Sequence, residues 1–82
     1  MPEVFRAGGW VYFFWSNEGH EPPHVHVRRG NNTGSVGKWW IAPTVRRASD
    51  GGFKKAELRV IEQTIVERRQ EILDAWKKHF NT

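Results

Sequence analysis

The stretch His24-Val25-His26-Val27-Arg28 decides the fold, because its apolar residues alternate with polar ones. Successive side chains of a β-strand point to opposite faces of the sheet. The two valines therefore face a side where a core can bury them, and the histidines and the arginine face the other side. This pattern predicts a half-buried strand whose outer face carries ionisable side chains.

The sequence predicts three further strands, two before this one and one after it. Val4–Ala7 and the aromatic run Trp10–Trp15 are separated by Gly8-Gly9, which predicts a hairpin. Val36–Ala42 is the next strand, and the turn formers of residues 30–34 predict a second hairpin before it. The amino-terminal half is therefore expected to hold four strands.

The carboxyl-terminal third changes to a helical period. Its apolar residues follow one another at spacings of 3, 4, 7, 4 and 4, one stripe of a helix: Leu58, Ile61, Ile65, Ile72, Trp76 and Phe80. A continuous helix over residues 54–80 would be about 40 Å long, whereas a globule of this size is only about 30 Å across. Because the stripe has a gap at Arg68-Arg69, we predict a break near residues 67–69. The alternative is a long helix that overhangs and pairs with a second subunit, which leaves a homodimer open.

These patterns predict one α+β domain over residues 1–82, an antiparallel meander of about four strands packed against a carboxyl-terminal helix or broken helix pair. Within it, 1–43 is the strand region, 44–53 a basic loop and 54–80 the helical region. The helical stripe is expected to meet the valines of the central strand. With no cysteine among 82 residues, disulfides, thiolate metal sites and a cysteine nucleophile are excluded.

The net charge of +4 is unevenly distributed. Residues 1–27 carry a net −2 and residues 60–82 are neutral, so residues 28–59, with eight basic and two acidic side chains, hold +6. A basic block of this kind attracts nucleic acid, anionic lipid or an acidic protein. The candidate nucleic-acid-binding residues are Arg28, Arg29, Lys38, Arg46, Arg47, Lys54 and Lys55. They interleave with Trp39-Trp40, one of which must point away from the core.

A resemblance to a known family covers nearly the whole chain. It rests on residues 2–6, on Phe14-x-Ser16-Asn17-Glu18-Gly19-His20-Glu21-Pro22-Pro23-His24-Val25-His26-Val27, and on Gly52-Phe53 before a helix that ends in Ile72-Leu73-x-Ala75-Trp76. With these residues the chain resembles the bacterial family called domain of unknown function 4160. Members are small proteins whose genes often lie beside another small family, which suggests a toxin-antitoxin-like pair. The resemblance implies a partner protein encoded by an adjacent gene. The chain departs from the family pattern in two places. Val25 stands between the histidines where relatives usually have an aromatic residue, and the middle of the chain is more basic than in relatives.

The segment from His20 to His26 is the densest group of ionisable side chains. His24 and His26 project from one face of a strand, with their α carbons roughly 6 to 7 Å apart. That spacing suits zinc, copper, iron or nickel, with a third ligand from the preceding loop: Glu18, Glu21 or His20. Alternatively, the two histidines fix the loop by hydrogen bonds to Glu18 or Glu21. We favour this alternative and predict no metal and no cofactor.

The same residues permit metal-free cleavage of RNA, so whether the protein is an enzyme stays open. His24 and His26 would act as base and acid, Glu18 or Glu21 would orient one imidazole, and Arg28 would face the phosphate with Arg6 or Arg46. The sequence itself dictates only the alternation of His24, His26 and Arg28.

The preferred hypothesis is a binding module. The chain starts with Met1-Pro2-Glu3, without the blocks of a signal peptide, and has no apolar run of membrane-spanning length. We therefore expect a cytoplasmic protein of a two-gene module that binds an anionic partner, RNA or DNA, through residues 28–59. The alternatives are the ribonuclease and a module that binds an acidic protein.

Overall fold

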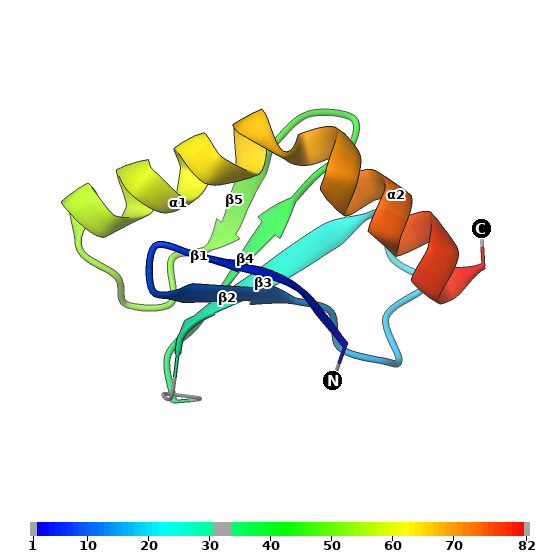
Figure 1. The fold of residues 1–82 in the computed structure, drawn as a ribbon, viewed down its shortest axis with the longest axis horizontal. Coiled ribbons are helices and arrows are strands. Elements are labelled where there is room, and N and C mark those ends of the chain that lie inside the picture. The colour runs from blue at the N-terminus through cyan, green and yellow to red at the C-terminus, as the bar shows by residue number, and fades with distance from the viewer. Residues whose placement is uncertain (1, 31–33, 82) are drawn as a thin grey trace.

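The chain forms a five-stranded sheet with two helices on one face, in a computed structural model that describes residues 2–30 and 34–81 (Figure 1). All neighbouring strands are antiparallel and follow one another in chain order. The predicted α+β meander packed against carboxyl-terminal helices is thus confirmed. The strands are β1 (Glu3–Ala7), β2 (Trp10–Phe13), β3 (His24–Arg29), β4 (Val36–Trp40) and β5 (Arg46–Ser49), and the helices are α1 (Lys55–Glu67) and α2 (Arg69–Phe80).

The first hairpin forms as the sequence predicts. Gly8 and Gly9 connect β1 to β2 with φ angles of 60° and 86°, the left-handed region that a two-residue hairpin turn requires at both positions. The turn predicted at residues 30–34 includes residues 31–33, which lie outside the described residues. The two strands that flank it, β3 and β4, pair from His24 opposite Trp40 to Arg28 opposite Val36.

The fifth strand corrects the prediction of a basic loop over residues 44–53. Arg46-Arg47-Ala48-Ser49 pairs with β4 and forms an edge of the sheet. All four residues are exposed, so this strand lacks the apolar alternation that marks a half-buried strand. Charged side chains are common on edge strands, where they hinder pairing with other chains. Hydrogen bonding to β4, which local sequence does not reveal, decides the conformation.

The helix breaks at Arg68, as predicted from the gap in the apolar stripe. Arg68 leaves helical geometry, with φ −110° and ψ 22°, and separates α1 from α2. Its guanidinium lies 3.5 Å from the ring centroid of Phe5 in β1. Arg69 donates from Nε to the carbonyl oxygen of Ile41, 2.7 Å away. The break therefore lets both helices stay on a molecule whose longest extent is 33 Å.

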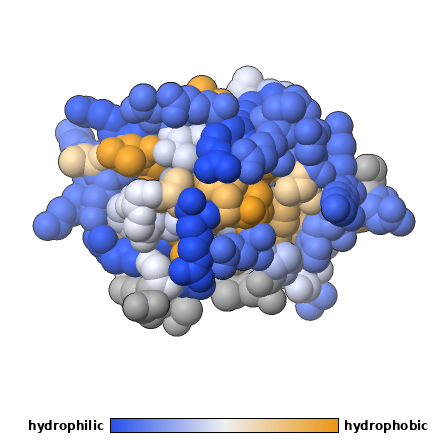
Figure 2. Space-filling view, in the orientation of Figure 1, coloured by the Kyte–Doolittle hydropathy of each residue, from blue (hydrophilic) through white to orange (hydrophobic). Residues whose placement is uncertain are grey.

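The core lies between the helices and the sheet. It includes the predicted contact between the two valines of β3 and the helical stripe, of which Ile61, Ile65 and Ile72 are fully buried. In Figure 2 apolar residues form a band below the largely hydrophilic helix layer. No described helix combines the length and apolarity needed to cross a membrane. The remaining face of the sheet is left for the polar residues of β3.

Candidate functional site on the open face of the sheet

The face of the sheet opposite the helices, here called the open face, carries the ionisable residues of the central strand. Residues paired directly across antiparallel strands share a face. Because Val25 and Val27 lie in the helix-side core, His24, His26 and Arg28 belong to the open face together with their partners. Four residues at the centre of the open face, Val11, Phe13, His24 and His26, are themselves buried. Following the register across the sheet, the open face comprises Glu3, Arg6, Val11, Phe13, His24, His26, Arg28, Val36, Lys38, Trp40, Arg46 and Ser49.

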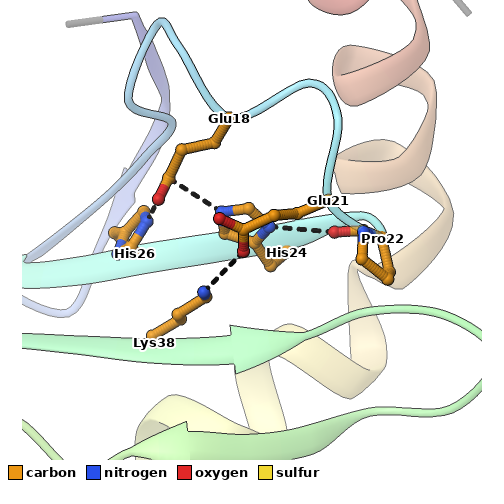
Figure 3. A network of polar contacts seen from close by, with 6 residues as sticks. All are labelled: Glu18, Glu21, Pro22, His24, His26 and Lys38. Carbon is orange, nitrogen blue, oxygen red and sulfur yellow. Dashed lines mark hydrogen bonds and ion pairs between the residues drawn. The ribbon is translucent and has the colours of Figure 1, made fainter.

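Glu18 joins the two histidines. Its loop precedes β3 and places the carboxylate over the strand, where Nε2 of His24 and Nε2 of His26 each lie 2.8 Å from the same oxygen, Oε1 (Figure 3). The sequence left Glu18 and Glu21 open as the partner of the histidines. The structure selects Glu18, and the predicted hydrogen bonding between the histidines and this loop is confirmed.

The loop also orients the ring of His24 from its other side. Nδ1 of His24 lies 2.9 Å from the carbonyl oxygen of Pro22 (Figure 3). A carbonyl oxygen only accepts, so Nδ1 is the donor and carries a proton. The Pro22-Pro23 pair thereby fixes the orientation of the His24 ring.

The cluster is buried on the histidine side and reachable on the glutamate side. The side chains of His24 and His26 are 1% and 4% exposed, whereas that of Glu18 is 23% exposed. Burial lowers the pKa of His26, more than its contact with Glu18 raises it. Burial by itself would raise the pKa of Glu18, but its hydrogen bonds with His24 and His26 bring that pKa below the usual value.

Aromatic rings enclose the histidine pair from both sides. Trp15, just after β2, lies 4.2 Å from the ring of His26 and is 41% exposed. Trp40 in β4 lies 5.4 Å from the ring of His24 and 4.3 Å from Nζ of Lys38. Phe13 stacks on His26 at 5.6 Å and is itself buried. Trp76 of α2 lies 4.9 Å from the ring of His24, so the helix layer also borders the cluster, while Trp15 and Trp40 border it on the open face.

The other predicted catalytic residues do not meet the histidines through a direct hydrogen bond. Glu21 accepts from Nζ of Lys38 at 2.8 Å, and that bond lowers the pKa of Glu21 (Figure 3). Arg28 donates from one terminal nitrogen to the carbonyl oxygens of Arg29 and Gly30. Its guanidinium lies 5.8 Å from the ring centroid of Phe13. Both residues therefore stabilise the surroundings of the cluster, and Glu18 takes the place beside the imidazoles.

The predicted basic block separates into two groups. Arg28, Lys38 and Arg46 belong to the open face, as the strand register shows. The rest lie toward the helices: Arg29 pairs with Glu57, Arg47 pairs with Glu62 at 2.6 Å, and Lys54 and Lys55 stand at the start of α1. The open face therefore holds only part of the positive charge that residues 28–59 carry in sequence.

Of the arginines and lysines on the open face, Arg46 makes the fewest polar contacts. Among residues 2–30 and 34–81, its side chain makes no hydrogen bond or ion pair, while Lys38 pairs with Glu21 and Arg6 with Glu3. It lies across β4 from His24, because Trp40 pairs with both residues. A free guanidinium next to an aromatic ring is suited to hold a phosphate group.

Two of these open-face residues were not identified from the sequence as site residues. The sequence indicates Trp15 only as the last residue of the aromatic run Trp10–Trp15, and it predicts that one of Trp39 and Trp40 points away from the core without deciding which. The structure buries Trp39 completely and leaves Trp40 on the open face. The sequence signal for both is the alternation of side chains along a strand, which places Trp15 on the same side as Phe13 and leaves Trp40 on the side of His26 once Trp39 is in the core.

The fold and the site define a small α+β protein with a histidine-glutamate cluster and a cationic, aromatic sheet face. A family model, Domain of unknown function (DUF4160), matches residues 9–77, and the chain belongs to this family. The resemblance stated from the sequence is thereby confirmed. Neither a curated protein nor a solved structure matches the chain.

Proposed function

We propose that this protein binds single-stranded nucleic acid, RNA or DNA, across the open face of its sheet. The observation that carries the proposal is the pair Trp40 and Arg46 on the adjacent strands β4 and β5, in which Arg46 makes no hydrogen bond or ion pair among residues 2–30 and 34–81. Single strands are commonly held by aromatic faces on which bases stack, next to cations that follow the phosphates.

The accessible rings support this proposal. Trp15 is 41% exposed although it packs on Phe13 and His26, so one part of its surface is held and another is free for a base. The helix-side tryptophans Trp10, Trp39 and Trp76 are buried in the core. An aromatic ring held in place by packing loses little conformational freedom when a base stacks on it.

The position of the cations refines the expectation from the sequence. The interface proposed here takes Arg28, Lys38 and Arg46 from the predicted set and leaves Arg29 and Arg47 with their glutamates on the helix side. An ion-paired cation must give up its carboxylate before it can bind phosphate, and this applies to Lys38, paired with Glu21, as it does to Arg47. Binding is therefore expected to depend more on Arg46 than on Arg47.

The test is fluorescence anisotropy of the protein with a short labelled single-stranded RNA, measured over a salt series. Each phosphate contact contributes about 0.7 to the slope of log affinity against log salt. Arg46→Gln is expected to weaken binding and to reduce this slope by about that amount. Arg59→Gln, which removes one charge from the exposed side of α1, is the matched control and should leave binding unchanged.

Stacking is tested by Trp15→Ala, with Trp15→Phe as the variant that keeps a ring. Loss of one stacking ring costs about 1–3 kcal/mol, roughly a 5- to 150-fold loss of affinity. Trp15→Phe should retain most of the binding. Equal affinity of wild type and Trp15→Ala, or equal effects of Arg46→Gln and Arg59→Gln, would reject the open face as the interface.

The same experiment distinguishes the two alternatives. Loss of full-length RNA that disappears in His24→Gln would make the protein a ribonuclease. Absence of any RNA binding at low salt would reject the nucleic-acid proposal and favour the alternative that the basic residues bind an acidic protein. Because His24 and His26 are almost fully buried, the proposal gives them no direct contact with the nucleic acid.

Membership of a two-gene, toxin-antitoxin-like module in the bacterial cytoplasm is a further part of this proposal, and it rests on the family resemblance. A partner protein would find two free strand edges, β1 and β5. Co-expression with the product of the adjacent gene, followed by gel filtration, tests this part. A complex of defined mass supports it, and two separate peaks reject it.

A further inference from the structure

We propose that Glu18, His24 and His26 form a binding site for a divalent transition metal ion of the zinc and iron class. The proposal is independent of nucleic-acid binding, and it revises the prediction from the sequence that no metal is bound. It rests on the mutual positions of three ligand atoms, on the hydrogen bond that orients His24 and on the accessibility of Glu18.

The three ligand atoms converge on one point. The carboxylate oxygen and the two imidazole nitrogens all lie within 4.8 Å of one another. Each Nε2 is 2.8 Å from Oε1 of Glu18. In a tetrahedral zinc site with bonds of about 2.0–2.1 Å, ligand atoms stand roughly 3.3 Å apart. To reach that spacing, the two nitrogen–oxygen distances would have to lengthen by about 0.5 Å through a shift of the partly exposed Glu18 side chain. The two Nε2 atoms, which lie within 4.8 Å of each other, would have to approach one another.

The hydrogen bond to Pro22 makes His24 a ready ligand. With Nδ1 donating to Pro22, the ring of His24 is oriented so that Nε2 faces the carboxylate oxygen 2.8 Å away. The position between these two atoms suits a positive species, either a proton or a metal ion. Metal-bound histidines usually donate their other ring N–H to a backbone carbonyl or carboxylate, as His24 does here.

No neighbouring side chain supplies that positive charge. Among residues 2–30 and 34–81, Glu18 contacts no lysine or arginine, and the nearby Lys38 is taken by Glu21. A metal ion would satisfy all three ligand atoms at once.

The donor set indicates the class of ion. Two imidazole nitrogens and one carboxylate oxygen suit zinc or ferrous iron, whereas magnesium prefers oxygen ligands. Three protein ligands leave at least one coordination position open. The partly exposed Glu18 supplies the route by which an ion and a further ligand would enter.

The test is a calorimetric titration of the full chain with Zn²⁺ alone, near neutral pH, with Mg²⁺ as the comparison ion. One Zn²⁺ per chain is expected, and no measurable binding of Mg²⁺. Glu18→Gln, His24→Gln and His26→Gln should each weaken Zn²⁺ binding by at least about tenfold, the smallest loss seen even when an outer partner of a ligand is removed. His79→Gln, which removes an exposed histidine of α2 outside the cluster, is the matched control and should bind as wild type.

Folding is checked by circular dichroism of each variant, because His24 is buried and its replacement alone could unfold the chain. Glu18→Gln, at a partly exposed position, then decides the question. A visible absorption spectrum with Co²⁺ in place of Zn²⁺ reports whether nitrogen ligands are bound. The proposal is overturned if folded wild type takes up no Zn²⁺, or if Glu18→Gln and His26→Gln bind it as tightly as wild type. RNA binding measured in the presence of a metal chelator tests the proposed function separately, because no metal ion is then bound.

Discussion

At the scale of single residues, Glu62 connects three elements through one carboxylate oxygen. Its Oε2 accepts from Nε1 of Trp39 at 2.8 Å and from Nε of Arg47 at 2.6 Å. Trp39 is fully buried, so its indole N–H has to be satisfied inside the protein. Glu62 on α1 thereby holds β4 and the edge strand β5 under the helix.

Replacing Glu62 by alanine is expected to destabilise the fold. The substitution leaves a buried indole N–H without its acceptor, which costs about 1–3 kcal/mol. Glu62→Gln keeps a carbonyl oxygen that can accept from Trp39 and should cost less. Urea unfolding of both variants measures the difference. Glu67→Ala, on the exposed side of the same helix, is the control, and a loss in Glu62→Ala no larger than in this control would contradict the argument.

At the scale of elements, the turn after β5 is set by close contact of backbones. Gly51 has φ 62°, and a Cβ at this position would lie 2.6 Å from the backbone nitrogen of Gly37 and 2.8 Å from the carbonyl carbon of Val36. Gly52 has φ 77°, with nothing within 4 Å of such a Cβ. The two glycines share backbone strain and differ in the space around them.

This difference predicts unequal effects of two adjacent substitutions. Gly52→Ala should cost about 1–2 kcal/mol, the price of a left-handed conformation for a residue with a Cβ. Gly51→Ala should cost distinctly more, because the chain of β4 has to move as well. Thermal or urea unfolding of the two variants is the measurement. Equal losses would mean that strain alone, without the contact to β4, decides this turn.

At the scale of the whole molecule, the net charge is +4, yet several glutamate carboxyl groups have a pKa below its usual value. Hydrogen bonds from Lys38 to Glu21, from the backbone of Lys54 to Glu57 and from Arg47 to Glu62 are the largest causes that lower the pKa of these glutamates. Each group has a lower pKa in the folded than in the unfolded chain. The folded chain therefore holds its carboxylates ionised to lower pH than the unfolded chain does.

Stability is accordingly expected to fall in acid. The contribution of these carboxylates is fully present above the unfolded pKa of about 4.3 and is lost as pH falls through the lower folded values. Urea unfolding at several values of pH from neutral down to about 3 measures this slope. Glu62→Gln should make the slope shallower, and Glu67→Gln is the matched control. An unchanged slope in Glu62→Gln would show that the ion pair with Arg47 does not contribute.

The sequence by itself determined the parts of this protein that have a strong local period. The alternation of residues 24–28 determined a strand with the valines on the helix side and the histidines on the other face, but the expectation of a half-buried strand was wrong, because both histidines are buried too. The apolar stripe with its gap at Arg68-Arg69 determined two helices on one face. Periodicity is informative here because burial of one face stabilises each element along its whole length.

Only the tertiary structure decided which groups meet. The β5 strand, all of it exposed, depends on hydrogen bonds to β4, and the choice of Glu18 over Glu21 depends on the path of a loop. The separation of Arg46 from Arg47 onto opposite faces follows from the strand register. Contacts of this kind join residues far apart in the chain, and local sequence carries no period that reports them. The candidate site is therefore a product of topology, built on strands that the sequence had largely specified.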